Sequence, residues 1–288
     1  MDERWNRRAN CEDGSDEQNC DIVEKGEGYS RLITPISNHE SGLVLVNITV
    51  DIEDILDINE VKEIFLVKFS VTRDWKDNGL TYVNLKKNSS WLNALTSEEA
   101  YSLWYPSFDI NNIENKKMFR ETSIDQVQLI IPNENFSYES GDITHESNIR
   151  IFKGSENVMS LTRQWSVKFI CHYNMVMYPF DTQLCRMEFL EGSNFLYLNP
   201  TKLLYDSNIS LNRHFVREVK MCRTKVAKKQ AIVVEVTLGR PLISNVLTVF
   251  IPTSILMVIS NIAGVFEEHF MDMVIEVNLT VLLVQATL

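Results

Sequence analysis

Residues 171–185 read CHYNMVMYPFDTQLC, with a cysteine at each end and thirteen residues between them. Tyr178, Pro179, Phe180 and Asp181 follow one another inside this segment. The chain has five cysteines in 288 residues, which excludes a small protein built on many disulfides. Two cysteines at this spacing suit an ordinary structural hairpin as well as a specialised loop, so the surrounding sequence decides between these interpretations.

The sequence on both sides of this segment predicts an all-β domain. Five stretches are rich in β-branched and aromatic residues, which favour strands. These stretches are residues 43–50, 64–71, 126–131, 158–170 and 231–238. Turn signals separate them, as in DNG at residues 77–79, and this recurrence predicts a β-sandwich over residues 21–240. Residues 97–103 are predicted to form a short helical turn.

The C-terminal part has the composition of membrane helices. Residues 241–266 contain no Lys, Arg, Asp or Glu, and a helix needs about 20 apolar residues to cross a bilayer. Pro252 lies within this run, which a membrane helix tolerates. A second apolar helix pattern occupies residues 274–288, too few for a span at about 1.5 Å per residue. We therefore expect a sequence that stops within its second membrane helix.

The N-terminal residues 1–20 resemble part of a low-density-lipoprotein receptor class A module. The resemblance rests on residues 11–20, CEDGSDEQNC, and implies that Asp16 and Glu17 match two calcium ligands of that module. Trp5 matches the residue that supplies a backbone carbonyl. Three oxygen donors do not complete a calcium site of seven or eight ligands, so we expect no bound metal and no cofactor.

Four Asn-X-Ser/Thr sequons precede the predicted span, which favours an extracellular, glycosylated domain. They are Asn47, Asn88, Asn135 and Asn208. A fifth, at Asn278, lies in the second apolar helix and is expected to carry no sugar. We therefore expect a multi-pass protein of the plasma membrane, with residues 1–240 outside the cell.

The segment 171–185 resembles the signature loop of the Cys-loop receptors, which are pentameric ligand-gated ion channels. Other segments resemble motifs of that family in the same order along the chain: residues 75–80, 104–106, 239–242, 251–253 and 278–284. The resemblance implies a disulfide between Cys171 and Cys185, with Cys222 outside it. It also implies an extracellular ligand-binding sandwich at 21–240, followed by a membrane region at 241–288 with one complete helix and a shortened pore helix.

The resemblance further implies an agonist, small-molecule or ionic, bound between subunits, of which four more complete the homo- or hetero-pentamer. In this family, aromatic side chains form a cage because a ring face attracts an ammonium group. The positions matching the cage are Ser70, Asn111 and Gly192, and none is aromatic. Phe108, Phe195 and Tyr197 lie close enough in sequence to compensate in part. The basic hairpin at residues 223–229 is interpreted as a solvated loop, with a lid over an acidic ligand as the alternative.

Two further sets of residues follow from the resemblance. Glu60, Asp181 and Arg240 match residues that couple the sandwich to the pore, although Arg240 could instead extend to lipid headgroups. Glu276, Thr280 and Leu283 match positions along the pore. The acids at 267, 268, 272 and 276 have no basic counterpart nearby, which favours cation selectivity if they face the pore. The alternative is that they only solvate a cytoplasmic turn.

Other functions find little support. The chain has 28 basic and 39 acidic residues, a net charge of −11, which argues against nucleic-acid binding. Its five histidines show no metal-ligand spacing, and neither a phosphate-binding glycine loop nor a nucleophile elbow is present, so we expect no enzyme. The alternative to a channel subunit is a receptor or adhesion ectodomain anchored by one membrane helix. The junction at 239–242 and the pore-helix match favour the channel.

Overall fold

The structure is a computed structural model that describes residues 22–35, 42–85, 90–114, 126–131, 151–205, 211, 214–226, 229–241, 246–263 and 271–287. Asp16, Glu17, Asn88, Asn135 and Asn208 lie outside the described residues. The chain divides into two compact units. The first comprises Met1–His172, Cys185–Ile209 and Val219–Val236, and the second Tyr173–Leu184, Ser210–Glu218 and Thr237–Leu288.

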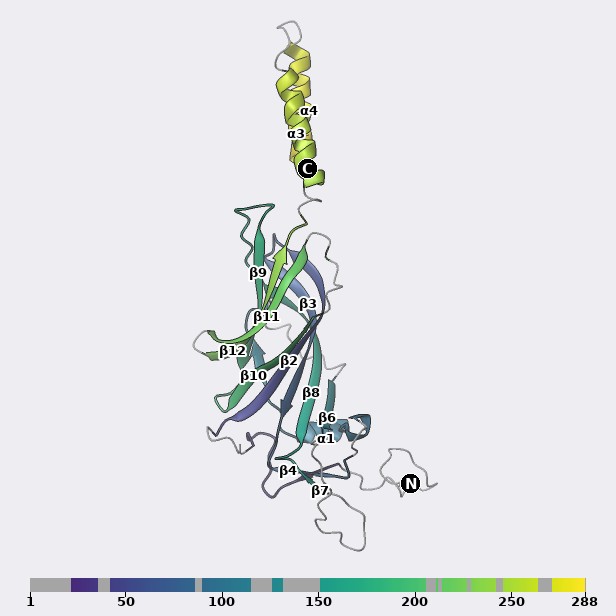
Figure 1. The fold of residues 1–288 in the computed structure, drawn as a ribbon, viewed down its shortest axis with the longest axis vertical. Coiled ribbons are helices and arrows are strands. Elements are labelled where there is room, and N and C mark those ends of the chain that lie inside the picture. Colours follow the sequence, from purple (N-terminus) through teal and green to yellow (C-terminus); the bar gives the residue numbers. More distant parts are fainter. Residues whose placement is uncertain are drawn as a thin grey trace, which may run out of the picture. The chain divides into compact units, whose positions relative to one another are not determined.

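The described strands form three sheets, in which the strands follow the orders β1-β4-β7, β10-β2-β3-β8-β6 and β11-β12-β9-β5. In the five-stranded sheet β10 runs parallel to β2, whereas β2, β3, β8 and β6 pair antiparallel. Figure 1 shows the long strands β2, β3 and β8 side by side. The strands are β1 (Val23–Lys25), β2 (Val44–Asn59), β3 (Ile64–Trp75), β4 (Leu80–Val83), β5 (Phe108–Ile110), β6 (Gln126–Ile131), β7 (Ile151–Lys153), β8 (Val158–Ile170), β9 (Thr182–Glu191), β10 (Leu196–Tyr205), β11 (Phe215–Val226) and β12 (Lys229–Gly239).

Buried and more exposed residues alternate along the strands, and the buried ones form the core. In β2 every second residue from Val44 to Ile52 is buried, and in β3 the same holds for Phe65, Val67, Phe69 and Val71. Successive side chains of a strand point to opposite faces, so this pattern buries one face of each strand and leaves the other polar. All five strands predicted from composition are confirmed, with β2 extending further than its apolar start at residues 43–50.

Four aromatic rings join the five-stranded sheet to the four-stranded sheet. Phe69 of β3 and Trp165 of β8 lie 5.8 Å apart between ring centroids, and Phe69 lies 5.8 Å from Phe189 of β9. Phe108 of β5 completes the group, 5.4 Å from Phe189 and 5.7 Å from Trp165. Tilted and edge-on ring pairs at these distances are favourable beyond the apolar area that they bury. The two sheets therefore pack face to face, and the predicted β-sandwich is confirmed.

The short helix α1 (Ser97–Ser102) begins with a capping box. The Thr96 hydroxyl accepts from the Glu99 N–H at 3.2 Å, and the Glu99 carboxylate accepts from the Thr96 N–H at 2.7 Å. This reciprocal pair satisfies two backbone donors that the first turn of a helix leaves free. The Glu99 carboxylate also accepts from the Ile22 N–H at 2.8 Å, which holds the chain before β1 against α1. The helical turn predicted at residues 97–103 is confirmed.

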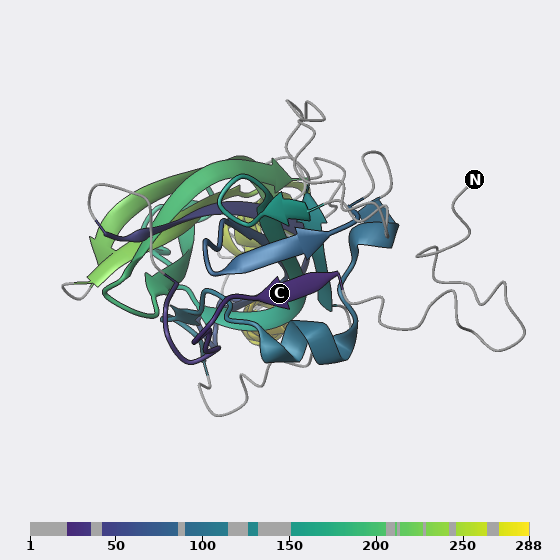
Figure 2. The ribbon, with the colours of Figure 1, turned by 90° about the horizontal axis from the view of Figure 1, so that it is seen from below.

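The turn that leads into the three-stranded sheet contains a buried carboxylate. Figure 2 shows β1, β4 and β7 side by side, and Asp77 lies in the turn between β3 and β4 with no exposed surface. Its carboxylate accepts from the Gly79 N–H at 2.9 Å and from the Tyr29 hydroxyl at 3.0 Å. The Tyr29 oxygen in turn accepts from the Trp104 N–H at 3.0 Å. These neutral partners join the two tryptophan motifs, and Trp75 packs on Trp104 with ring centroids 6.3 Å apart.

The free energy of unfolding of the Asp77→Asn variant, relative to that of the wild type, is expected to increase as pH rises. Burial raises the pKa of Asp77, against the opposing hydrogen bonds from Gly79 and Tyr29. The folded chain therefore holds this proton more tightly than the unfolded chain. The contribution of Asp77 to the free energy of unfolding is fully present below the ordinary aspartate pKa of about 3.9. This contribution is lost as pH rises through the folded pKa, by at most about 1.4 kcal/mol per pH unit.

Urea unfolding of the wild type and Asp77→Asn, between about pH 4 and pH 7, measures this difference. The matched control is Asp109→Asn, which neutralises an exposed carboxylate on β5. We expect the stability of Asp77→Asn relative to the wild type to increase with pH, and to increase more than that of the control. A pH-independent difference for Asp77→Asn would contradict the assignment.

The second unit contains the two apolar helices of the C-terminal part. A π-helical turn (Val246–Phe250) leads into α3 (Ile251–Ala263), and α4 (Met271–Thr287) lies beside α3 (Figure 1). Proline has no N–H to donate, so the regular helical pattern is interrupted one turn before Pro252. The hydroxyls of Thr253 and Ser254 donate to the Phe250 carbonyl at 3.1 and 2.6 Å. The Ser260 hydroxyl donates to the Asn278 side chain, which links α3 to α4.

The described helical residues fall within the two predicted segments or extend them. The first segment was predicted at 241–266, and its described helical residues run from 246 to 263, with 242–245 and 264–270 outside the description. The second begins at Met271 rather than at residue 274. Among the described residues, no helix combines the length and the apolar character that crossing a membrane requires.

Candidate functional site

A disulfide between Cys171 and Cys185 closes the loop that the sequence analysis singled out. The two Cα atoms lie 5.1 Å apart, and both residues are buried. Cys171 follows β8, and Cys185 lies within β9, so the bridge ties two neighbouring segments of the chain at the base of the loop. The third cysteine of this region, Cys222, is a free and exposed thiol on β11.

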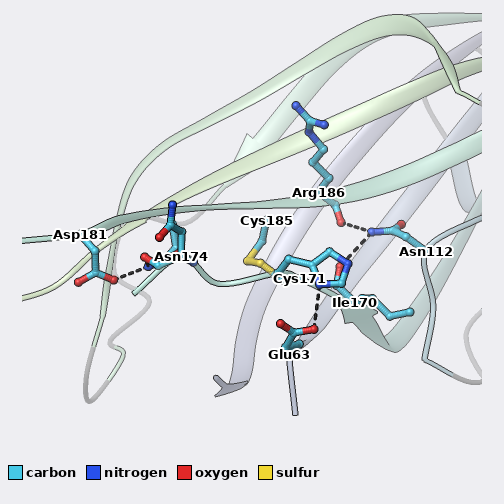
Figure 3. The surroundings of a disulfide bond; sticks show 10 residues. Glu63, Asn112, Ile170, Cys171, Asn174, Asp181, Cys185 and Arg186 are labelled. Atoms are coloured by element: carbon cyan, nitrogen blue, oxygen red, sulfur yellow. Dashed lines mark hydrogen bonds and ion pairs between the residues drawn. A yellow bond between two sulfur atoms is a disulfide. The ribbon is translucent and has the colours of Figure 1, made fainter. Parts of the chain in front are cut away.

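Asn112 holds the base of the loop from the side, as Figure 3 shows. Its side-chain NH₂ donates to the Arg186 carbonyl at 2.6 Å and to the Ile170 carbonyl at 3.4 Å. Its side-chain oxygen accepts from the Glu188 N–H at 3.1 Å. One amide thus uses both its donor and its acceptor atoms on the strands next to the disulfide. This role was not predicted, because no sequence pattern relates Asn112 to residues about seventy positions away.

The tip of the loop is apolar and exposed. Val176, Met177 and Phe180 have exposed fractions of 85%, 66% and 64%. Two tight turns shape the tip, because the Tyr178 N–H donates to the Met175 carbonyl at 3.1 Å and the Phe180 N–H donates to the Met177 carbonyl at 2.7 Å. A monomeric soluble protein rarely exposes several large apolar side chains together, so this tip has the character of a contact surface.

Asp181 and Arg240 form a buried ion pair within the second unit. The Arg240 Nε–H donates to the Asp181 carboxylate at 2.7 Å, and the side chains are only 4% and 2% exposed. The Arg240 guanidinium also lies 4.9 Å from the Tyr178 ring centroid and 3.3 Å from the Met175 sulfur. Arg240 therefore does not extend toward solvent. It links the end of β12 to the loop between Cys171 and Cys185.

The carboxylate of Asp181 is held in its charged form. Burial raises the pKa of Asp181, but the hydrogen bonds from Arg240 and Gln183 and the positive charge of Arg240 lower it, and the net shift is downward. Gln183 also accepts from the Asn174 N–H and donates to the Asn174 carbonyl, each at 2.8 Å. The charge pair is thus embedded in a network that spans the loop, which is the condition under which a buried pair holds its geometry.

The third residue predicted for this cluster lies in the other unit. Glu60 is half-buried in the turn that joins β2 to β3. In the same turn, Glu63 pairs with His172 at 2.8 Å, but both side chains are largely exposed, so this pair adds little to stability. Of the three predicted residues, the structure brings Asp181 and Arg240 into contact, and Glu60 stays a prediction.

The positions that match the aromatic cage lie on the sandwich and have polar partners or no room. Ser70 is half-buried on β3, opposite Asp51 and Gln164 of the neighbouring strands. The Asn111 side chain donates to the Glu188 carboxylate at 2.7 Å. At Gly192 a Cβ atom would lie 2.6 Å from the Ser107 carbonyl oxygen, closer than real side chains approach a backbone. An aromatic side chain at Gly192 is therefore excluded by sterics as well as absent from the sequence.

The interpretation of the basic hairpin as solvated is wrong for Arg223. Its side chain is 21% exposed and donates to the Glu191 carboxylate at 2.7 Å. The Arg223 guanidinium carbon lies 3.6 Å from the centroid of the Tyr197 ring. Lys225 and Lys229 are exposed as predicted, and residues 227–228 lie outside the described part. The sequence pointed to Tyr197 only as an aromatic near the site, and its partner could not be found from spacing.

The residues predicted for the pore lie on α4. Glu276, Thr280 and Leu283 are exposed and recur at helical spacing, so they share one face of α4. The Thr280 hydroxyl donates to the Glu276 carbonyl at 2.8 Å, the usual bond of a threonine to the preceding turn. Their place in a pore is a prediction.

Two of the sequon asparagines, Asn47 and Asn278, lie among the described residues. Asn47 is half-buried on β2, and its side-chain oxygen accepts from the Asn199 side chain at 2.9 Å. Asn278 contacts Ser260 of α3. Glycosylation of Asn47 and of the three sequons outside the description stays a prediction. Across the described residues, no group of three His, Cys, Asp or Glu side chains is arranged to hold a metal ion.

Comparison with known proteins gives two matches. Residues 18–195, more than half of the chain, match the model of the neurotransmitter-gated ion-channel ligand binding domain. A glutamate-gated chloride channel of Drosophila melanogaster is 21% identical over 276 residues, covering 92% of this chain. The chain spans 55% of the length of that relative. The matching family consists of membrane-embedded channels with an extracellular ligand-binding domain, not of enzymes. The chain therefore belongs to the Cys-loop family of ligand-gated ion channels.

Proposed function

We propose that the chain is a subunit of a pentameric channel in the plasma membrane, in which an agonist bound between the sandwiches of neighbouring subunits opens an ion pore. The sandwich at 21–240 lies outside the cell in this proposal, and residues 241–266 and 274–288 contribute to the membrane region. The lack of charged residues between 241 and 266 supports the first of these assignments. The family match supports the extracellular part.

The buried pair of Asp181 and Arg240 is the observation that carries the proposal. Removing two charges from water costs several kcal/mol per ion. The hydrogen bonds that Arg240 and Gln183 donate to the Asp181 carboxylate offset that cost. Arg240 directly follows the last strand and directly precedes the apolar stretch, while Asp181 belongs to the disulfide-closed loop. A rigid link at this point transmits movement of the last strand to the loop and to the residues that follow. In this proposal the pair is part of the gating machinery, together with Glu60.

The chemistry of the agonist site differs from an ammonium cage. Ser70, Asn111 and Gly192 offer no ring face, and Asn111 is engaged with Glu188. The relative is named a glutamate-gated channel, so amino acids belong among the compounds to be tested.

Two observations point in opposite directions for the permeant ion. The exposed acids Asp272 and Glu276 on α4 favour cations if five copies surround a pore, whereas the relative is named a chloride channel. The cation assignment rests on the acids at 267, 268, 272 and 276, and the reversal potential measures it directly.

Voltage-clamp recording from cells that express the full-length gene tests the proposed function. The panel contains glutamate and other amino acids, amines, quaternary ammonium ions and steps in pH. We expect at least one of them to evoke a current. Replacing external sodium shifts the reversal potential of a cation channel, and replacing chloride shifts that of an anion channel. Surface-expressed protein that sediments as a monomer and passes no current would instead support a receptor ectodomain anchored in the membrane.

A further inference from the structure

Arg223 of β11 lies over an aromatic ring and against a carboxylate. The guanidinium carbon is 3.6 Å from the Tyr197 ring centroid, and Nη2 is 2.7 Å from Oε1 of Glu191. The three residues belong to the first compact unit, at the end of β9 and on β10 and β11. None of them was assigned a role in the proposed function.

A ring face beside a carboxylate is a site for an organic cation. The ring quadrupole attracts a cation within about 6 Å of the centroid, and the attraction grows when water is excluded. The Glu191 side chain is 12% exposed, so its charge is poorly screened by solvent. The Leu198 N–H donates to the same Oε1 at 3.2 Å, which positions the carboxylate independently of Arg223. The site would therefore keep its shape if Arg223 were absent.

The guanidinium does not use its full bonding capacity in this position. Its Nε atom is buried and has no hydrogen-bond partner among the described residues. A buried donor without a partner costs free energy, which offsets part of the gain from the ring and the carboxylate. Attachment to β11 compensates for this, because a tethered group binds without the entropy loss of a free ligand.

We infer that Arg223 is a tethered cation that occupies a binding site for small organic cations formed by Tyr197 and Glu191. In the native chain the Arg223 side chain occupies the ring face of Tyr197 and so prevents amines and quaternary ammonium ions from binding there. The inference goes beyond the proposed function, because it concerns binding to this chain and requires no current.

Calorimetric titration of the purified chain with tetramethylammonium, in a nonionic detergent, tests the inference. Arg223→Gln removes the charge and is expected to raise the affinity about tenfold or more over the wild type. Arg223→Lys keeps a tethered cation and should stay at the wild-type affinity. Arg223→Met is a second neutral variant that retains an apolar stem against the ring. Thermal unfolding of each variant shows which of them keeps the wild-type fold.

Variants of the ring separate the site from a general charge effect. In the Arg223→Gln background, Tyr197→Phe should keep the gain in affinity, and Tyr197→Leu should abolish it. Arg31→Gln is the matched control, since Arg31 also lies over a tyrosine ring, 4.3 Å from the centroid of Tyr101, but donates to neutral oxygens of that residue. We expect no gain for Arg31→Gln.

Equal affinity of the wild type and both folded neutral variants would overturn the inference, as would a gain that survives Tyr197→Leu. The proposed channel function is tested separately. Currents from a chain without this cation site would leave the channel assignment intact, and a clear cation site on a chain that passes no current would leave the inference intact.

Discussion

Replacing Cys185 with serine is expected to lower the free energy of unfolding by about 3 kcal/mol and to prevent delivery of the protein to the cell surface. The disulfide joins residues 14 positions apart and restricts the unfolded chain, which is the main source of its stabilisation. Both cysteines are buried, so the Cys185→Ser variant would bury a hydroxyl at 185 and a thiol at 171. Burying a polar group costs free energy unless it forms a hydrogen bond. Such a loss is a large fraction of the stability of a domain.

Urea unfolding of the purified chain and surface biotinylation of expressing cells measure the two effects. Cys222→Ser is the matched control, because Cys222 is a free, exposed thiol. An exposed substitution of this kind usually changes stability by less than about 0.5 kcal/mol. Normal surface expression of Cys185→Ser, or peptide mapping that pairs Cys171 with another cysteine, would refute the assignment of the loop.

Arg240→Ala is expected to cost about 3–5 kcal/mol, because it leaves the Asp181 carboxylate buried without its charge partner. Arg186→Ala is the matched control, since Arg186 pairs with Glu235 at 3.0 Å but its side chain is 53% exposed. A pair exposed to this extent contributes at most about 1 kcal/mol. Both variants remove an arginine from an ion pair with a carboxylate, and the two pairs differ most in burial.

A double-mutant cycle measures the link itself. Asp181→Asn and Arg240→Ala should each reduce stability, and where protein reaches the surface each should reduce the agonist-evoked current. The double variant should lose less than the sum, with a coupling energy of about 0.5–3 kcal/mol. A second cycle with Glu60→Ala tests the third predicted member. An additive result for Asp181 and Arg240 would contradict an energetic link between them.

The pair should also be insensitive to mild acid. Burial raises the pKa of Asp181, but Arg240 and Gln183 lower it further than burial raises it. A carboxylate with a lowered folded pKa stabilises the chain fully above its unfolded pKa of about 3.9, and this contribution is lost only as pH falls through the lower folded value. A pH-sensitive current between about pH 5 and pH 8 would therefore originate elsewhere.

Much of the fold was predictable because it depends on patterns that are local in sequence. The alternation of apolar residues in β2 and β3, the capping residues of α1 and the spacing of Cys171 and Cys185 each act within a few residues or one loop. The contact of Asp181 with Arg240 followed from the family resemblance, not from periodicity. The second helix begins at Met271 rather than at residue 274, because a search for apolar residues passes over a first turn that contains Asp272.

The sequence by itself determined the sandwich, the disulfide-closed loop and the family, since strand periodicity and motif order are written along the chain. Only the tertiary structure decided what surrounds the positions that match the family's aromatic cage. It showed that Gly192 has no space for a ring and that Arg223 reaches Glu191, 32 residues away. These facts depend on which strands become neighbours. A side chain that looks solvated in a basic hairpin is buried or exposed according to the strand that packs beside it.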